Sequence, residues 1–230
     1  MLIGWTTLLI YLIFKKQKVL IERKSALKFL GNGILIALHW YCFFEAIVRS
    51  NVSIALVFLS TTALFTSFVE PLITKKKFNP KELITSVLVV IGIIVIMNDL
   101  NFSENETYLS AIVFSLLAAL LAALFSVYNS VFVKEHHSGV ISLYELFGGF
   151  VFISLLFLLS GDIVVSELHL TMEQFSWLFL LGTICTSFAF LMGVYVMRFI
   201  PAYTVNLSVN LEPIYAIILA LLFFKDSELM

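Results

Sequence analysis

The sequence is poor in the charged residues that cover the surface of a soluble protein. Only 13% of its 230 residues are charged, whereas 61% are hydrophobic, and the mean hydropathy is +1.05. Soluble domains are about 25% charged and about 45–50% apolar. A soluble chain of this length can form a core, but it needs far more polar surface to cover that core. The composition therefore excludes an ordinary soluble domain and indicates a membrane protein.

Cysteine is also scarce, and charge of neither sign is in excess. The two cysteines, Cys42 and Cys185, lie inside apolar runs, and no CxxC or CxxH spacing occurs. We therefore expect buried free thiols rather than disulfides or a zinc site. The net charge of −1 gives no reason to expect nucleic acid as a partner. No nucleophile–base arrangement or phosphate-binding glycine loop supports an enzyme, so no cofactor or metal is expected.

Long hydrophobic runs dominate the rest of the sequence. A membrane-spanning helix needs about 20 mostly apolar residues. An additional run, residues 1–14, is too short to span a membrane and has neither the basic start nor the cleavage site of a signal peptide. Because the runs are continuous rather than alternating, we expect helices and not a barrel. The seven longer runs are residues 27–48, 52–74, 83–97, 108–133, 140–160, 175–197 and 203–224.

The loops between these runs differ in charge. All 14 lysines and arginines except Arg49 and Lys225 fall in or beside the odd-numbered loops. Loops 98–107 and 161–174 contain acidic residues and no base. Short loops rich in lysine and arginine stay in the cytoplasm. We therefore predict a multi-pass protein of the cell inner (plasma) membrane with its basic loops cytoplasmic.

Two of the runs have a similar layout. Residues 52–74 and 203–224 align at an offset of 150, which pairs Leu72 with Leu222, although few residues are identical. The loop charges place the two runs in opposite directions through the membrane. Inverted repeats are a common construction of secondary transporters, in which the solute site lies near the middle of the membrane.

Several short motifs resemble those of the EamA-type transporters of the drug/metabolite transporter superfamily. The order and spacing of these motifs cover essentially the whole chain. One departure is Ala63, because the first repeat of that family usually has a proline there. The motifs are LHWYCFFEA from Leu38, SIAL from Ser53, STTALF from Ser60, YELFGG from Tyr144, LGT from Leu181 and NLEP from Asn210.

This resemblance implies an all-α fold, a polytopic membrane helical bundle of inverted five-helix repeats with about eight of the ten helices present. Residues 1–100 are expected to form the first repeat, truncated at its N-terminus, with helices 2–5. Residues 101–230 are expected to form the second, with helices 6–9 and without the last helix. The resemblance also implies a secondary transporter that exports a small metabolite or amino-acid-like solute by alternating access. A passive facilitator or channel of the same architecture is the alternative.

Polar side chains at membrane depth are the candidates for the solute or ion pathway, because their burial in lipid is costly. Glu212, beside the helix break at Pro213, can bind a cation, a proton or a substrate amine, or remain a buried protonated acid. His39 can titrate near neutral pH and couple transport to protons. The pathway candidates are His39, Trp40, Thr62, Thr66, Tyr144, Glu145, Asn206, Asn210 and Glu212.

These candidates also have structural interpretations. Asn206 and Asn210 share one helix face, nearly opposite Glu212, and can bond a neighbouring helix instead of lining a cavity. Glu145 can gate the cytoplasmic mouth or pair with Lys134 or a loop histidine, and the glycines after it allow close helix approach. The expected partners are the lipid bilayer and a small-molecule solute, with protons as a candidate coupling ion. The sequence specifies neither the substrate nor the oligomeric state.

Overall fold

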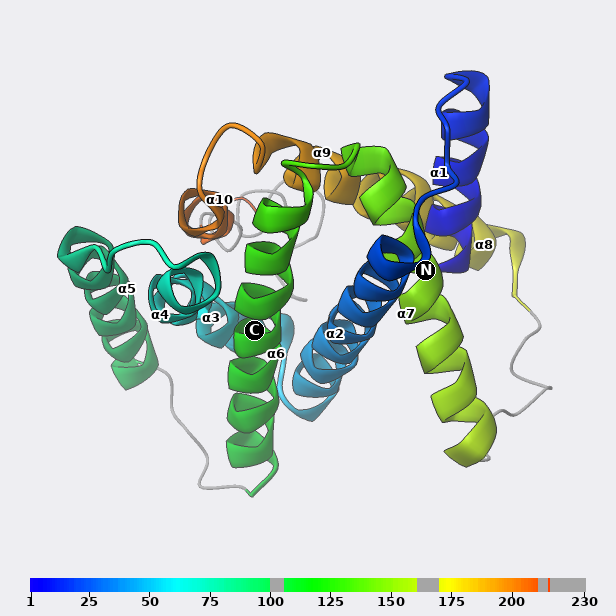
Figure 1. The fold of residues 1–230 in the computed structure, drawn as a ribbon. Helices are drawn as coiled ribbons and strands as arrows, with labels where there is room; N and C mark the ends of the chain where they lie inside the picture. The colour runs from blue at the N-terminus through cyan, green and yellow to red at the C-terminus, as the bar shows by residue number, and fades with distance from the viewer. Residues whose placement is uncertain (100–105, 161–169, 211–214, 216–230) are drawn as a thin grey trace. The chain divides into compact units, whose positions relative to one another are not determined.

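The computed structural model describes residues 1–99, 106–160, 170–210 and 215, and every regular element within them is a helix (Figure 1). The predicted all-α fold is thus confirmed. Five helices are long and apolar enough to cross a membrane, as a multi-pass membrane protein requires. They are Arg23–Arg49, Ile54–Thr74, Tyr108–Phe132, Ser138–Ser160 and Met172–Val196.

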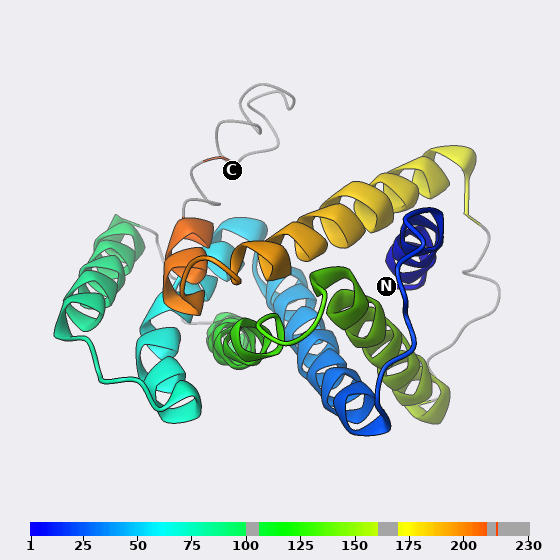
Figure 2. The same cartoon turned by 45° about the horizontal axis from the view of Figure 1, so that its top comes forward.

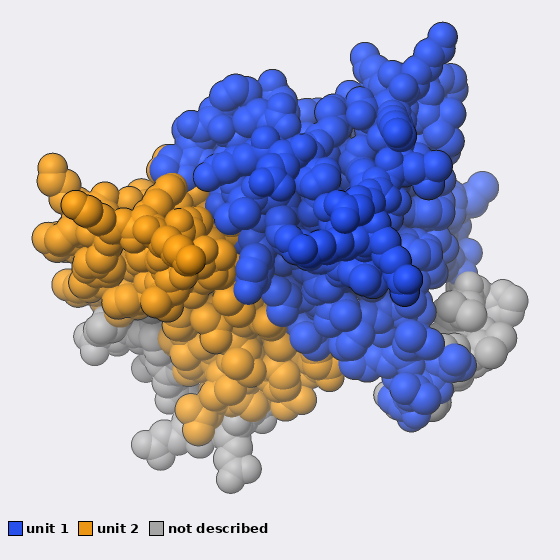
Figure 3. Space-filling view, in the orientation of Figure 1, with its two compact units in different colours: residues 1–38, 128–201 blue, residues 39–127, 202–230 orange. Residues whose placement is uncertain are grey.

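The chain divides into two compact units, and each unit combines two separate stretches of sequence (blue and orange in Figure 3). Unit 1 comprises residues 1–38 and 128–201, and unit 2 comprises residues 39–127 and 202–230. The two predicted repeats, 1–100 and 101–230, divide the sequence in a different way and stay a prediction.

Unit 1 contains the short helix α1, the start of α2, the end of α6 and the helices from α7 to α9. Within this unit α1 packs against α7 and against a π-helical segment. The elements are α1 (Leu2–Phe14), the first part of α2 (Arg23–Arg49), the last turn of α6 (Glu106–Phe132), α7 (Ser138–Ser160), α8 (Met172–Leu180), the π-helical segment (Leu181–Phe188) and α9 (Ala189–Val196).

Unit 2 contains the other parts of the two long helices and a set of shorter ones. Within it α4 packs against both α10 and α5. The elements are the second part of α2, α3 (Val52–Leu59), α4 (Thr62–Thr74), α5 (Pro80–Asp99), most of α6 and α10 (Ala202–Val209).

The run at residues 52–74 was expected to be one helix, but it is interrupted by a turn at Ser60 and Thr61 between α3 and α4. The hydroxyls of Ser60, Thr61 and Thr62 each donate to a carbonyl three residues earlier. Such bonds compete with the backbone hydrogen bonds of a helix. They also satisfy these carbonyl groups, to which lipid can offer no hydrogen bond. The acceptors are the carbonyl oxygens of Val57, Phe58 and Leu59, at 2.6, 2.7 and 2.6 Å.

The π-helical segment lies inside the span Met172–Val196, whose existence the sequence predicted but whose local geometry it did not. Glycines bring this segment close to α1. A Cβ atom on Gly182 would lie 2.6 Å from the side chain of Ile3, and one on Gly4 would lie 2.9 Å from that of Thr186. Small residues therefore set the distance between these two elements.

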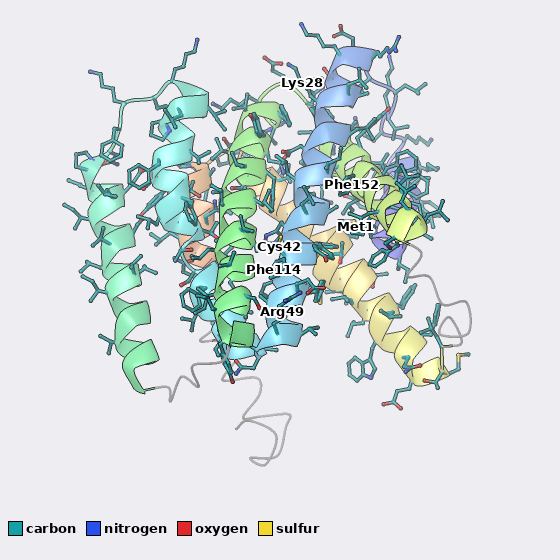
Figure 4. All side chains as sticks on the ribbon, turned by 90° about the horizontal axis from the view of Figure 1, so that it is seen from below. Met1, Lys28, Cys42, Arg49, Phe114 and Phe152 are labelled. Atoms are coloured by element: carbon teal, nitrogen blue, oxygen red, sulfur yellow. The ribbon has the colours of Figure 1, made fainter. Side chains whose placement is uncertain are left out.

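Glycines also bring α2 and α7 together in unit 1. A Cβ atom on Gly33 would overlap the backbone carbonyl of Glu145, and one on Gly148 would lie 2.5 Å from the carbonyl oxygen of Leu30. This contact confirms the expectation that the glycines after Glu145 allow close helix approach. Met1 also contacts α7, because its side chain lies beside Gly149; Figure 4 labels Met1 next to this helix.

Many side chains on the outside of the helices are large and apolar. Leu159 on α7 is 86% exposed and Trp177 on α8 is 64% exposed. The ribbons of α7 and α8, in yellow-green and yellow, can be followed in Figure 2. Exposed apolar surface on this scale is what lipid covers in a membrane protein.

We predict that Gly33→Ala destabilises the protein by about 1–3 kcal/mol, because the new methyl group meets rigid backbone atoms of α7. Gly31→Ala is the matched control, since Gly31 is exposed and a Cβ atom there meets nothing within 4 Å. Alanine in a helix interior is favoured over glycine by about 0.5–1 kcal/mol, so the control is expected to be neutral or stabilised. Unfolding in mixed micelles measures both variants, and equal stabilities would contradict the close contact.

Candidate functional site

Glu145 lies on α7 and is completely buried in unit 1. One of its carboxyl oxygens, Oε1, accepts a hydrogen bond of 2.7 Å from Nδ2 of Asn32 on α2. The same amide nitrogen lies 3.3 Å from Oδ1 of Asn129 on α6, which is also fully buried. The three residues form a cluster, the Glu145 cluster, that connects three helices inside unit 1.

The Glu145 cluster contains buried polar atoms that have no partner among the described residues. They are Oε2 of Glu145 and Nδ2 of Asn129. Ser142, one turn before Glu145 on α7, has an unpartnered hydroxyl of the same kind. Among the residues that the structure describes, Glu145 forms no ion pair with Lys134 or a histidine, so its neighbour is an amide instead of the expected cation.

Glu70, on α4, is the second buried carboxylate in the described helices. Its Oε1 forms an ion pair of 2.9 Å with Nζ of Lys76, and its Oε2 accepts a bond of 3.0 Å from the backbone N–H of Tyr203. Tyr203 is in the first turn of α10, where the helix dipole favours a negative charge. Glu70 is only 4% exposed, because these partners hold it inside unit 2.

The hydroxyl of Tyr203 continues this connection to α5. It donates to the carbonyl oxygen of Glu82 at 2.9 Å and lies 3.3 Å from the hydroxyl of Ser86. Three helices of unit 2, α4, α5 and α10, are therefore joined at the start of α10.

A second polar cluster, the Asn206 cluster, lies further along α10. Asn206 is buried and donates both hydrogens of Nδ2, to Oγ1 of Thr66 and to Oγ of Ser126, each at 2.7 Å. Each hydroxyl donates in turn to a carbonyl of its own helix. The structure thus brings together the predicted residues Thr66 and Asn206. Their bond joins two helices, as expected if Asn206 bonds a neighbouring helix.

His39 is buried on the part of α2 that belongs to unit 2. Its Nδ1 lies 2.8 Å from the carbonyl oxygen of Ala118, so Nδ1 carries the proton and donates. Its ring is stacked on Phe43 and meets the ring of Phe125 edge-on. This environment holds a neutral imidazole in place. The neighbouring Trp40 is half-buried.

The remaining predicted residues are placed in different parts of the molecule. Thr62 is buried, and its hydroxyl donates to the carbonyl oxygen of Leu59 at the end of α3. Tyr144 is half-buried in unit 1, edge-on to Phe29. Asn210 follows α10, and its Nδ2 is buried without a partner among the described residues. Glu212 and Pro213 lie outside the described residues.

The loop before α7 is held by His137, the residue that precedes this helix. Its Nδ1 accepts a bond of 3.1 Å from the backbone N–H of Gly139, which requires an unprotonated Nδ1. Burial and the nearby Arg198 guanidinium lower the pKa of His137, so the neutral form that caps the helix is favoured. Arg198 itself donates to the carbonyl oxygens of Val133 and His136, which fixes the same loop.

Sequence reasoning missed three polar partners. Asn32, Asn129 and Ser126 were not among the candidates, although each is a polar residue inside a long apolar run. An asparagine at membrane depth needs a partner, and this signal was available for Asn32 and Asn129. Their connection to Glu145 was not, because it depends on how three helices pack.

The arrangement of these groups is suited to binding a polar solute. The polar atoms are a carboxyl group, amides and hydroxyls, which form hydrogen bonds with polar solutes and exchange protons. No group of three His, Cys, Asp or Glu residues that could hold a metal ion occurs in the described part of the chain.

Comparison with known proteins finds a family and a similar solved structure. The model of the EamA-like transporter family matches residues 1–98 and 109–227. A solved crystal structure, described only as that of a protein, superposes with a TM-score of 0.76 over 97% of this chain and 76% of the other, at 14% sequence identity. That similarity concerns the fold. No curated protein sequence matches the chain.

We predict that Thr66→Val destabilises the protein by about 0.6 kcal/mol, and by no more than about 1.7 kcal/mol, because Asn206 loses one of its two interhelical acceptors. Thr204→Val is the matched control, since it makes the same chemical change at an exposed position of α10. Unfolding in mixed micelles compares the two. A loss of the same size in both variants would show that the interhelical bond contributes nothing.

Proposed function

We propose that this chain, which belongs to the EamA-like transporter family, moves a small metabolite or amino-acid-like solute across the membrane by alternating access. The family and the five apolar helices establish a multi-pass membrane protein of the transporter type. The substrate class, the mechanism and export as the direction are the proposed part.

A matched pair of short helices carries the proposal of alternating access. Both α3 (Val52–Leu59) and α10 (Ala202–Val209) have 8 residues, and they begin 150 positions apart, at the offset of the inverted repeat. Each is followed by a turn residue, Ser60 or Asn210. Interrupted helices at corresponding positions of two halves mark the binding site in many secondary transporters. The two stretches matched by the family model, 1–98 and 109–227, also support two repeats.

The turns after α3 and α10 lie beside polar groups that suit a small polar solute. Thr61 and Thr62 are buried at the turn after α3, and Asn210 lies at the turn after α10. The Asn206 cluster is within one or two helical turns of both along α4 and α10. A site of amides and hydroxyls with few charges recognises a polar solute by directional hydrogen bonds. We assign Thr62, Thr66, Asn206 and Asn210 to this solute site.

The other proposed pathway residues have supporting roles. His39, with Trp40 beside it, fixes α2 through its bond to Ala118. Tyr144 lies next to Glu145 on α7, and Glu145 is the buried acid that can bind an ion. Glu212, with Pro213 as a helix break, stays a proposed site residue on the sequence argument alone.

A passive facilitator or channel of the same architecture is the second candidate. It predicts uptake that saturates but ignores the proton gradient, and that is unchanged in Glu212→Gln.

Transport is tested with the full chain in proteoliposomes. We expect counterflow of at least one radiolabelled solute from a panel of amino acids and small polar metabolites. Asn206→Ala is expected to lower the rate about tenfold, which corresponds to about 1.4 kcal/mol, whereas Glu135→Gln, an exposed loop substitution, leaves it unchanged. No counterflow of any solute, with or without a proton gradient, would contradict the proposal.

The proposed orientation in the inner membrane, with basic loops in the cytoplasm, is tested by labelling single cysteines in whole cells. In a background without Cys42 and Cys185, we expect an impermeant maleimide to label Leu170→Cys, in a loop without basic residues, and not Lys77→Cys. Both positions are in loops. Permeabilised cells serve as the control, because both cysteines then react. Labelling of Lys77→Cys alone in intact cells would reverse the orientation.

A further inference from the structure

We propose that the Glu145 cluster is a proton-binding site, in which Glu145 takes up and releases the hydrogen ion that is coupled to transport. This inference rests on the proposed function, because a coupling proton has meaning only in a transporter. It names the coupling ion and the residue that carries it.

The two buried carboxylates of the described helices differ in how their charge is compensated. Glu70 has an ammonium group at 2.9 Å and the N-terminus of α10 at 3.0 Å, so its negative charge is balanced. The groups beside Glu145 are the neutral amides of Asn32, whose Nδ2 donates at 2.7 Å, and of Asn129. An ionised carboxylate with so little compensation is costly at membrane depth, whereas the protonated acid is not.

The surroundings of Glu145 leave room for both protonation states. Oε1 is held by Asn32, and Oε2 has no partner among the described residues. Oε2 can therefore carry the proton without breaking a bond that the structure shows. The amides of Asn32 and Asn129 are held in place around the carboxyl group, so they can donate to the carboxylate once the proton has left.

In the part of the chain that the structure describes, no charged group forms an ion pair with Glu145 and so competes with the proton. His137, at the start of α7, uses Nδ1 to cap the helix. Within unit 1 the ionisable groups on the surrounding elements are the amino group of Met1 and Tyr11 with α1, Arg23, Lys24 and Lys28 on α2, Tyr128 on α6, Cys185 on the π-helical segment and Tyr195 on α9.

The donors around Glu145 favour a proton over a metal cation. A hard cation needs several oxygen ligands. Here the hydrogen-bond partner of the carboxyl group is an N–H donor, and a further N–H group, that of Asn129, lies in the same cluster without a partner among the described residues. The reaction is a single protonation: the carboxylate and one hydrogen ion from water on one side of the membrane form the acid. The acid returns the hydrogen ion to water on the other side.

His39 does not suit the binding of the coupling proton, because its surroundings cannot compensate a positive charge. Its Nδ1 hydrogen is donated to Ala118, and two aromatic rings surround the imidazole. Adding a second proton would place an uncompensated positive charge in an apolar environment. The coupling proton predicted for His39 is therefore assigned to Glu145.

Infrared difference spectroscopy of the full chain in lipid films, between acidic and alkaline pH, tests the site without any solute. We expect a carbonyl band of a protonated carboxylic acid that disappears as the pH rises and shifts in heavy water. Glu145→Gln is expected to lose this band. Glu70→Gln is the matched control, because it removes another buried carboxyl group whose charge is balanced, and it should retain the band.

A second variant keeps the test valid if Glu145→Gln does not fold. Asn32→Leu removes the donor to Oε1, so the band is expected to persist to higher pH than in the wild type. A band that survives in Glu145→Gln, or that is lost only in Glu70→Gln, overturns the proposal. Counterflow with a band independent of Glu145 would refute the proton site and leave transport standing. A Glu145-dependent band without counterflow would refute the proposed function instead.

Discussion

The whole structure depends on one constraint: lipid offers no hydrogen bonds, so each polar group within the membrane must be satisfied by the protein. Backbone groups are satisfied by helices. The hydroxyls of Ser60, Thr61 and Thr62 extend the same solution to a place where the helix is interrupted. Polar side chains are then found in clusters, and the clusters join helices. Glu145, Glu70 and Asn206 each connect elements that are distant in sequence.

The same constraint distinguishes groups with a structural role from groups that can change state. Asn206 uses both of its amide hydrogens, and Glu70 uses both of its oxygens. Bonds of this kind fix helix positions. Glu145 has an oxygen without a partner among the described residues, and a buried polar atom without a partner is costly in a protein that has no use for it. Within unit 1, glycines surround this residue with tightly packed backbone, which limits how its environment can relax.

The sequence predicted the class of fold because hydrophobic length alone determines which segments cross a membrane. It also found Thr66, Asn206 and Glu145, since polar residues at membrane depth are rare. It did not predict the turn at Ser60 or the π-helical segment Leu181–Phe188, because hydropathy does not register local hydrogen-bond geometry. It did not predict the bond between Glu70 and the backbone of Tyr203, because only the packing of α4 against α10 brings these residues together.

The two bonds between α4 and α10 have a mechanical consequence. Glu70 holds the backbone of Tyr203, and Thr66 holds the side chain of Asn206, so the helices are fastened at two points about one turn apart on each. One bond would still allow α10 to rotate relative to α4. Two bonds prevent both rotation and sliding of one helix against the other. α4 and the start of α10 should therefore move as one rigid body. This rigid body can bend relative to α3 at the turn formed by Ser60 and Thr61, where the helix is already interrupted.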